Sequence, residues 1–294
     1  MGATILFASL LTGCQSQGQS VSDISASTIP LPVVHSTEKP KYSRVVALAN
    51  GSAEIVAALG YKSVLVGRDV ASTLPDFSSI PIDNPGHTIS PELVLSQKPD
   101  LIIIDANSSP QTALTTLAKS GIRIVKIADS FSVNAIVSKE AAVASTLGVP
   151  LAGKALESQV TAKTYPQTAT KTLFLYLRGT ASIYLIGGKG SGADSLFAAM
   201  GFHDVGAENL AQPFSAMSAE ELVKLNPDVI VLMSKGLQSV GGVDGFVALP
   251  GVAQTRAGKE RRITTVDDSL LLSFGPRTPG LLTLLRANIL KAAA

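Results

Sequence analysis

Short apolar runs alternate with helical patterns along most of the chain. From Arg44 onward, runs rich in Val, Ile and Leu are separated by segments that carry apolar residues at helical spacing. Continuous apolar strands with helices between them are typical of parallel sheets whose two faces are both covered. The pattern predicts strands at 44–48, 63–67, 101–105 and 122–127, and helices at 52–60, 91–97 and 111–121.

The second half of the chain repeats this plan. The stretch SPELVLSQKPDLIII begins at Ser90, and SAEELVKLNPDVIVL begins at Ser218. In both, a serine caps the helix, a glutamate in the first turn suits the helix dipole, and a proline ends the helix before an apolar strand. We therefore predict two related Rossmann-like α/β lobes with mainly parallel sheets. Ligands of such folds bind in the cleft at the carboxyl ends of the strands.

The two predicted lobes are separated by Ala-rich helical sequence. Residues 132–148 and 150–165 contain no internal proline, and the second segment is interpreted as a helix that joins the lobes. The expected boundaries are an N-terminal lobe at 42–148, a linking helix at 149–169 and a C-terminal lobe at 170–294.

The first residues have the composition of an export signal. The apolar run at 3–12 is too short to cross a bilayer, which needs about 20 residues, but it fits the core of a secretory signal. The following Leu11-Thr12-Gly13-Cys14 resembles the bacterial lipobox, in which the cysteine is lipidated, although no Lys or Arg precedes Cys14. We expect a lipoprotein signal peptide at 1–14, followed by a flexible Ser-, Gln- and Pro-rich tether at 15–41.

Composition and motifs exclude several classes of function. Lys and Arg total 24 against 22 Asp and Glu, with no basic block, so nucleic acid is not expected as a partner. The single cysteine excludes an intramolecular disulfide. The chain contains no G-x-S-x-G elbow, zinc motif or paired catalytic carboxylates, and GGKGSGAD at 187–194 fits neither phosphate-loop pattern. A binding role is therefore favoured over an enzyme.

One of the three histidines stands in an informative position. His35 lies in the predicted tether, and His203 follows a helix as an ordinary surface residue. His87 follows the Pro85-Gly86 turn and stands three residues ahead of Ser90, which caps the helix at 91–97. A lone histidine in a loop is usually a surface residue, so its interpretation depends on a partner elsewhere in the chain.

A Tyr-x-Arg motif lies on the first predicted strand of the second lobe. Because side chains alternate along a strand, Tyr176 and Arg178 share one face of 172–179, near its carboxyl end and the cleft. A neighbouring guanidinium favours the phenolate form of tyrosine, which is the form that binds ferric iron. Tyr176 also fits a core tyrosine whose hydroxyl is satisfied by Arg178, and Tyr184 is a rival phenol near the same cleft.

These features together resemble a known class of proteins. The lipobox, the tether, the two lobes and the paired S-x-E-helix-P-D-strand units are similar to ABC-importer substrate-binding proteins for haem, siderophores and cobalamin, over residues 42–290. Within that class, YLRGTASIYLIGGKGSGADSLFAAMG at 176–201 and LLSFGPRTPG at 271–280 look like haem-binding proteins, particularly those of actinobacteria. Leu74 in ASTLP stands where other haem binders of the class have a tyrosine.

The resemblance implies a specific function. His87 and Tyr176 would ligate ferric haem from opposite lobes, with Arg178 beside the phenolate. The lipid-anchored protein would lie on the extracellular face of the cell membrane, receive haem directly or from a donor protein, and deliver it to a dimeric ABC permease with its ATPase. Glu92 and Glu220 would each dock against permease arginines.

Alternatives remain open at the level of sequence. A siderophore- or corrinoid-binding protein of the same fold is the nearest one, although the chain has no Trp and five Tyr for the contacts that siderophores need. A zinc or manganese site needs three or four converging ligands, and only His87 is placed for it. Arg277 is interpreted either as a partner of a haem propionate or as the cap of a final helix.

Overall fold

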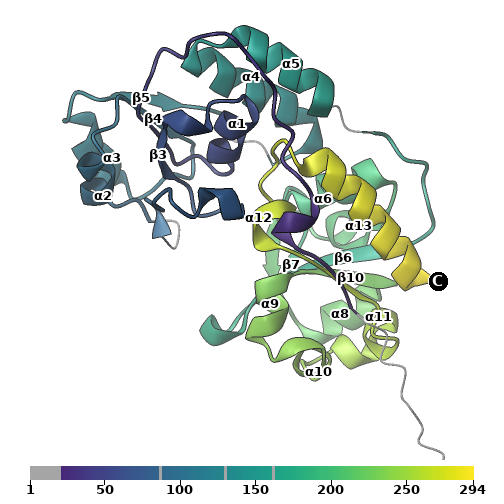
Figure 1. The fold of residues 1–294 in the computed structure, drawn as a ribbon. Helices are drawn as coiled ribbons and strands as arrows, with labels where there is room; N and C mark the ends of the chain where they lie inside the picture. The colour runs from purple at the N-terminus through teal and green to yellow at the C-terminus, as the bar shows by residue number, and fades with distance from the viewer. Residues whose placement is uncertain (1–20, 86–87, 129–130, 161–162) are drawn as a thin grey trace, which may run out of the picture.

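The computed structural model describes residues 21–85, 88–128, 131–160 and 163–294. These residues form two α/β lobes, each built on its own β-sheet (Figure 1). The N-terminal lobe is the upper one in Figure 1 and the C-terminal lobe the lower one. The mixed α/β fold with mainly parallel sheets confirms the fold class that the sequence predicts.

The N-terminal lobe has a four-stranded parallel sheet of order β3-β2-β4-β5. Its central strands are buried throughout, since helices cover both faces. Val45 and Leu101 face α1, α4 and α5, whereas Val46 and Ile102 face α2 and α3. The elements are β2 (Val45–Ala47), α1 (Ser52–Ala58), β3 (Leu65–Arg68), α2 (Pro91–Ser96), β4 (Leu101–Ile104), α3 (Gln111–Ala118), β5 (Arg123–Lys126), α4 (Ile136–Leu147) and α5 (Pro150–Val160).

The C-terminal lobe has a larger sheet of order β1-β11-β10-β6-β7-β9, with β8 also paired to β6. Strands β1, β11, β10, β6 and β8 pair in parallel, and β7 and β9 are antiparallel. Its strands are β1 (Ser22–Ile24), β6 (Lys171–Arg178), β7 (Ile183–Gly187), β8 (His203–Asp204), β9 (Phe214–Ala216), β10 (Val229–Met233) and β11 (Ile263–Val266). Its helices are α6 (Ala193–Met200), α7 (Val205–Asn209), α8 (Ala219–Leu225), α9 (Ser234–Ser239), α10 (Gly242–Val247), α11 (Arg256–Lys259), α12 (Asp268–Leu271) and α13 (Thr278–Ala293).

The repeated serine-capped helices form as predicted. Ser90 Oγ accepts a hydrogen bond from the backbone N–H of Leu93 at 3.4 Å, and Ser218 Oγ accepts one from that of Glu221 at 3.1 Å. The proline after each helix leads into a central strand, β4 or β10. Each of the two strands ends at the edge of its own sheet that faces the other lobe. The two halves of the repeat therefore meet at one cleft.

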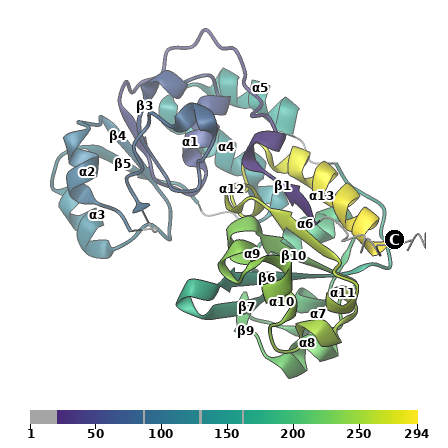
Figure 2. The same ribbon diagram turned by 60° about the horizontal axis from the view of Figure 1, so that its bottom comes forward.

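The prediction of a flexible tether at 15–41 is wrong for its described part. Residues 22–24 form β1, which extends the C-terminal sheet beside β11 (Figure 2), and the chain then crosses to the N-terminal lobe. Ile24, Ile29 and Val34 are buried along this path. Single buried apolar residues at this spacing match neither the period of a strand nor that of a helix, so the sequence of the segment resembles a linker. At the end of the path the Val34 carbonyl lies 2.6 Å from where a Cβ of Gly60 would stand, a close approach that glycine permits.

The helix that connects the two cores is α4 rather than the predicted segment at 149–169. Ile136, in the first turn of α4, packs in the core of the C-terminal lobe, whereas Val143 and Leu147 pack in that of the N-terminal lobe. Helix α5 instead lies against α4 within the N-terminal lobe, where Gly153 allows close contact with Ala144. Both segments are Ala-rich, and only the tertiary contacts distinguish them.

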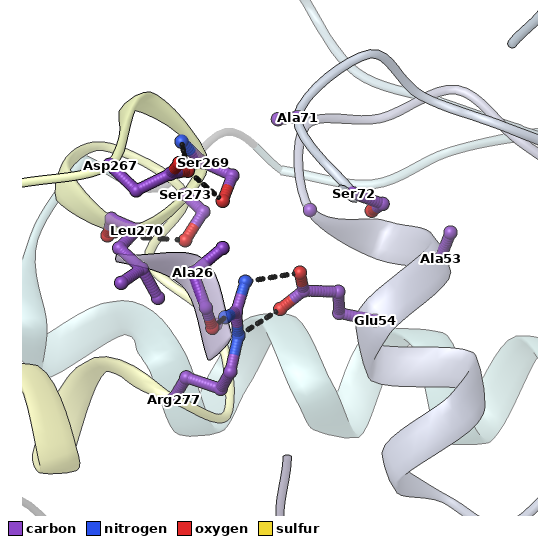
Figure 3. A network of polar contacts seen from close by, with 12 residues as sticks. Ala26, Ala53, Glu54, Ala71, Ser72, Asp267, Ser269, Leu270, Ser273 and Arg277 are labelled. Carbon is purple, nitrogen blue, oxygen red and sulfur yellow. Dashed lines mark hydrogen bonds and ion pairs between the residues drawn. The ribbon is translucent and has the colours of Figure 1, made fainter. Parts of the chain in front are cut away.

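Buried charges fasten the lobes to each other beside α4. The Arg277 guanidinium donates two hydrogen bonds to the Glu54 carboxylate on α1, one of them from Nε at 2.8 Å, and a third to the Ala26 carbonyl at 2.6 Å (Figure 3). Both side chains of the pair are at most 3% exposed. Lys139 Nζ on α4 donates to the carbonyls of Asn50 at 2.6 Å and Ser273 at 2.9 Å, one on each lobe. Neither role considered for Arg277 holds, because its side chain neither lines the cleft nor caps α13.

Candidate ligand-binding cleft

A cavity of about 540 Å³ lies between the lobes. The N-terminal lobe lines it with residues at or beyond the carboxyl ends of β2, β3 and β4, and the C-terminal lobe lines it with the ends of β6 and β10 and with α12. Small-molecule sites typically measure about 300–1,000 Å³, so the cavity is large enough for a cofactor-sized ligand. The carboxyl ends of parallel strands are where open α/β sheets bind ligands.

Tyr176 and Arg178 both line the cavity from the end of β6. The Arg178 guanidinium stacks over the Tyr176 ring, with Cζ 4.7 Å from the ring centroid, and no hydrogen bond joins it to the phenol. Phe214 of β9 packs edge-on against the same ring, with centroids 6.0 Å apart. Within the described part of the chain, the phenolic oxygen therefore has no protein partner and is free to meet a ligand.

Asp268 holds the guanidinium in place over the ring. Its Oδ2 accepts a hydrogen bond from Arg178 Nη2 at 3.1 Å, and its Oδ1 accepts one from the backbone N–H of Lys235 at 3.2 Å. The Asp268 side chain is 14% exposed and that of Arg178 32%, so the ion pair is partly shielded from water. The stacked Arg178 is thus a positioned group rather than a freely moving side chain.

Tyr184 does not line the cavity. It pairs with Leu177 across β6 and β7 and therefore shares the face of the sheet opposite to Tyr176. It packs against the hydrophobic core on that face of the sheet, to which Leu222 of α8 and Phe246 of α10 belong. Of the two phenols considered from the sequence, only Tyr176 borders the cavity.

His87 lies outside the described residues, as does Gly86 before it. Asn84 and Ile89, which stand one position beyond the residues that flank this gap, both line the cavity from the N-terminal lobe. Asn84 Oδ1 accepts a hydrogen bond from the backbone N–H of Val70 at 2.8 Å. Ligation by His87 therefore stays a prediction.

The cavity is also lined by side chains that the sequence analysis does not single out, among them Phe131, Lys235 and Asp268. Phe131 is 41% exposed and meets Phe274 edge-on, with ring centroids 6.4 Å apart. Lys235 lies in the first turn of α9, directly after β10, and Asp268 in the first turn of α12, after β11. The rule that ligands bind beyond the carboxyl ends of strands is the signal that identifies Lys235 and Asp268.

Asp69 is a buried carboxyl at the inner wall of the cavity. It is 1% exposed and accepts hydrogen bonds from the backbone N–H of Gly51 at 3.0 Å and the Ser72 hydroxyl at 2.7 Å. Burial raises the pKa of the Asp69 carboxyl, against the effect of these hydrogen bonds and of Lys139. Asp69 thus stabilises the backbone at the N-terminus of α1 and does not offer a free charge to a ligand.

The remaining predicted residues lie away from the cavity. Glu92 and Glu220 are exposed in the first turns of α2 and α8, one on each lobe. Cys14 lies outside the described residues. In the described part of the chain, no helix is long and apolar enough to span a bilayer.

Two lobes with a ligand-sized cavity at their strand ends define a binding protein of the two-lobed α/β class. Comparison with known proteins is consistent with that class, since residues 45–270 match the family described as periplasmic binding protein. The chain belongs to this family. It is therefore a binding protein and not an enzyme, as the sequence predicts.

Solved structures and one curated relative are similar to this chain over most of its length. The apo periplasmic heme-binding protein RhuT from Roseiflexus sp. RS-1 is 34% identical, with a TM-score of 0.78 over 86% of this chain and 99% of that one. The heme-binding protein HmuT is 31% identical, with a TM-score of 0.79 over 92% of this chain and 94% of its own. The uncharacterized ABC transporter substrate-binding lipoprotein YvrC of Bacillus subtilis (strain 168) is 26% identical, covering 94% of this chain and 91% of YvrC.

Proposed function

We propose that this protein is the haem-binding component of an ABC importer and holds ferric haem between its lobes. The observation that carries the proposal is the phenol of Tyr176, which borders the cavity beneath the stacked Arg178 and has no hydrogen-bond partner among the described residues. A phenolate is a ligand that ferric haem iron accepts. The similarity to RhuT and HmuT, both named heme-binding proteins, supports the same ligand.

His87 supplies the second axial ligand in this proposal. A neutral imidazole binds haem iron through a ring nitrogen, and one ligand from each lobe would place the porphyrin across the cleft. The lining fits such a ring, because apolar side chains come from both lobes, including Leu48, Ile89, Phe131, Met233 and Leu272. Arg178 and its partner Asp268 act as positioning residues for Tyr176.

A titration of the purified protein with hemin tests the proposal. The expected result is an intense Soret band that saturates at one haem per chain and shows the features of six-coordinate ferric iron. Cobalamin and a ferric siderophore serve as parallel ligands, because the same fold accommodates them. Saturable binding of either one, without a hemin-dependent Soret band, would contradict haem as the ligand and favour a corrinoid- or siderophore-binding protein.

Membrane anchoring is part of the proposed role. Lipidation of Cys14 would hold the protein on the extracellular face of the membrane, where it receives haem directly or from a donor protein. We predict that metabolic labelling with a fatty-acid analogue marks the wild type but not Cys14→Ser, when both are expressed from the native upstream region. A labelled Cys14→Ser protein would refute lipidation at this position.

Glu92 and Glu220 are proposed to dock the loaded protein on a dimeric permease that works with an ATPase. The two exposed carboxylates lie at equivalent positions of the internal repeat, and charge-assisted pairs with arginine suit such recognition. Replacing both by alanine is expected to lower haem uptake at least ~10-fold, because each lobe loses its charged contact. Hemin binding in vitro should be unchanged.

The neighbouring Glu221→Gln provides the control for this prediction. It removes an acid from the same turn of α8, but not one that has an equivalent on the other lobe. Uptake by Glu221→Gln should equal that of the wild type. Wild-type uptake by the Glu92→Ala, Glu220→Ala double variant would reduce both residues to acids that complement a helix dipole.

A further inference from the structure

The charged side chains that line the cavity differ in whether they already form hydrogen bonds or ion pairs with other residues of the protein. Five such side chains occur among the described residues: Asp69, Asp105, Arg178, Lys235 and Asp268. Asp69 and Asp105 accept hydrogen bonds from backbone amides and serine hydroxyls, and Arg178 is paired with Asp268. Lys235 is exposed, and its ammonium makes no hydrogen bond or ion pair with any described residue.

The backbone of Lys235 is fixed next to the predicted iron ligand. One Asp268 carboxylate accepts the Lys235 N–H through Oδ1 and the Arg178 guanidinium through Oδ2, so both cations are anchored on the same group. Strands β6 and β10 are parallel neighbours in the sheet, and their carboxyl ends carry Tyr176 and Lys235 to the same wall of the cavity. The flexible four-carbon stem of lysine then lets its ammonium reach a group on a ligand bound at Tyr176.

Arg277 is not available for this role. Its guanidinium is buried, and the hydrogen bonds that it makes with the described residues go to Glu54 and the Ala26 carbonyl. Arg178 is not available either, because it is ion-paired with Asp268 and stacked on the ring of Tyr176. Lys235 is thus the one cation of the described lining that is free to neutralise an acidic ligand.

We propose that Lys235 binds a carboxylate of the ligand and so makes the cavity selective for an acidic porphyrin over a neutral one. The inference rests on the proposed function, since ferric haem carries two propionates that extend from one edge of the ring. A Lys235–propionate pair orients that edge toward α9 and α12, while Tyr176 holds the iron. Because Lys235 does not bind the metal, it changes affinity and orientation but not the coordination of the iron.

The test compares hemin with hemin dimethyl ester, in which both carboxylates are neutral. The variants are Lys235→Gln and Lys235→Arg, with Lys189→Gln, an exposed lysine of the same lobe that does not line the cavity, as the control. The wild type is expected to bind hemin about 5-fold more tightly than the ester, as a solvent-accessible ion pair contributes. Lys235→Gln should lose this preference by weakening hemin binding alone, Lys235→Arg should keep it, and every Soret spectrum should match that of the wild type.

Two outcomes would contradict the role of Lys235, and only the second of them would also contradict the proposed function. Equal hemin affinity of the wild type and Lys235→Gln, with a normal Soret band in both, would refute the role of Lys235 and leave the proposed function standing. No Soret band with either porphyrin in the wild type would refute the proposed function and this inference together.

Discussion

Tyr176→Phe is expected to weaken the binding of ferric haem at least ~100-fold and to remove the charge-transfer absorption of an iron–phenolate bond. Substitution of groups that only support a metal ligand costs about 10–100-fold in affinity, so loss of a ligand itself should reach or exceed the upper value. The phenylalanine ring keeps the packing against Phe214 and the stacking of Arg178, and the change is confined to one oxygen. The measurement is a hemin titration followed by absorbance.

Tyr184→Phe is the matched control. It removes the same atom from a tyrosine eight positions further along, on the opposite face of the sheet and outside the cavity lining. Its spectrum and affinity should equal those of the wild type. His87→Ala should shift the spectrum toward five-coordinate iron, and the His87→Ala, Tyr176→Phe double variant should lose stoichiometric binding. Wild-type spectra in the double variant would eliminate this pair as ligands.

The second large effect is expected at the buried ion pair between the lobes. Arg277→Met leaves the Glu54 carboxylate buried without its partner, and such an uncompensated charge typically costs about 3–5 kcal/mol of unfolding free energy. Denaturant unfolding of the apo protein measures this loss. Because the pair lies outside the cavity lining, the folded variant should still give the hemin spectrum of the wild type.

A double variant shows whether the loss of stability comes from the unpaired charge of Glu54 or from the altered packing. Glu54→Leu combined with Arg277→Met replaces the pair with apolar side chains, which is often close to neutral for stability. The double variant should therefore be more stable than Arg277→Met alone, although the Ala26 carbonyl loses one donor. A single variant within about 1 kcal/mol of the wild type would contradict the assignment of Arg277 as the link between the lobes.

Local signals in the sequence predict much of this fold. The serine caps at Ser90 and Ser218, the prolines after each helix and the apolar runs predict the paired helix–strand units and the parallel sheets. The two-residue period of strands likewise places Tyr176 and Arg178 on one face, which the structure confirms. These features depend on residues close to one another in the chain.

The features that the sequence does not predict depend on distant residues. The buried stripe of α4 continues from one core into the other, so its apolar period alone does not tell which core it contacts. Ile24, Ile29 and Val34 become buried only because the chain runs along both lobes. Arg277 finds its partner 223 residues away, at Glu54, and no local pattern marks such a pair.

The candidate site shows the same division. The Tyr-x-Arg motif is visible in the sequence of one strand. The hydrogen bonds of Asp268 to Arg178 and to the backbone of Lys235 instead join three segments that are distant in the sequence. In the sequence, Phe131 is a single apolar residue in a polar loop, and only the structure shows that it lines the cavity.

A crystal structure of the protein with bound hemin tests the central claim most directly. We predict a single haem in the cavity between the lobes, with its iron bonded to the phenolate oxygen of Tyr176 and to an imidazole nitrogen of His87. A haem bound elsewhere, or one in the cavity whose iron is not bonded to Tyr176, would contradict the account.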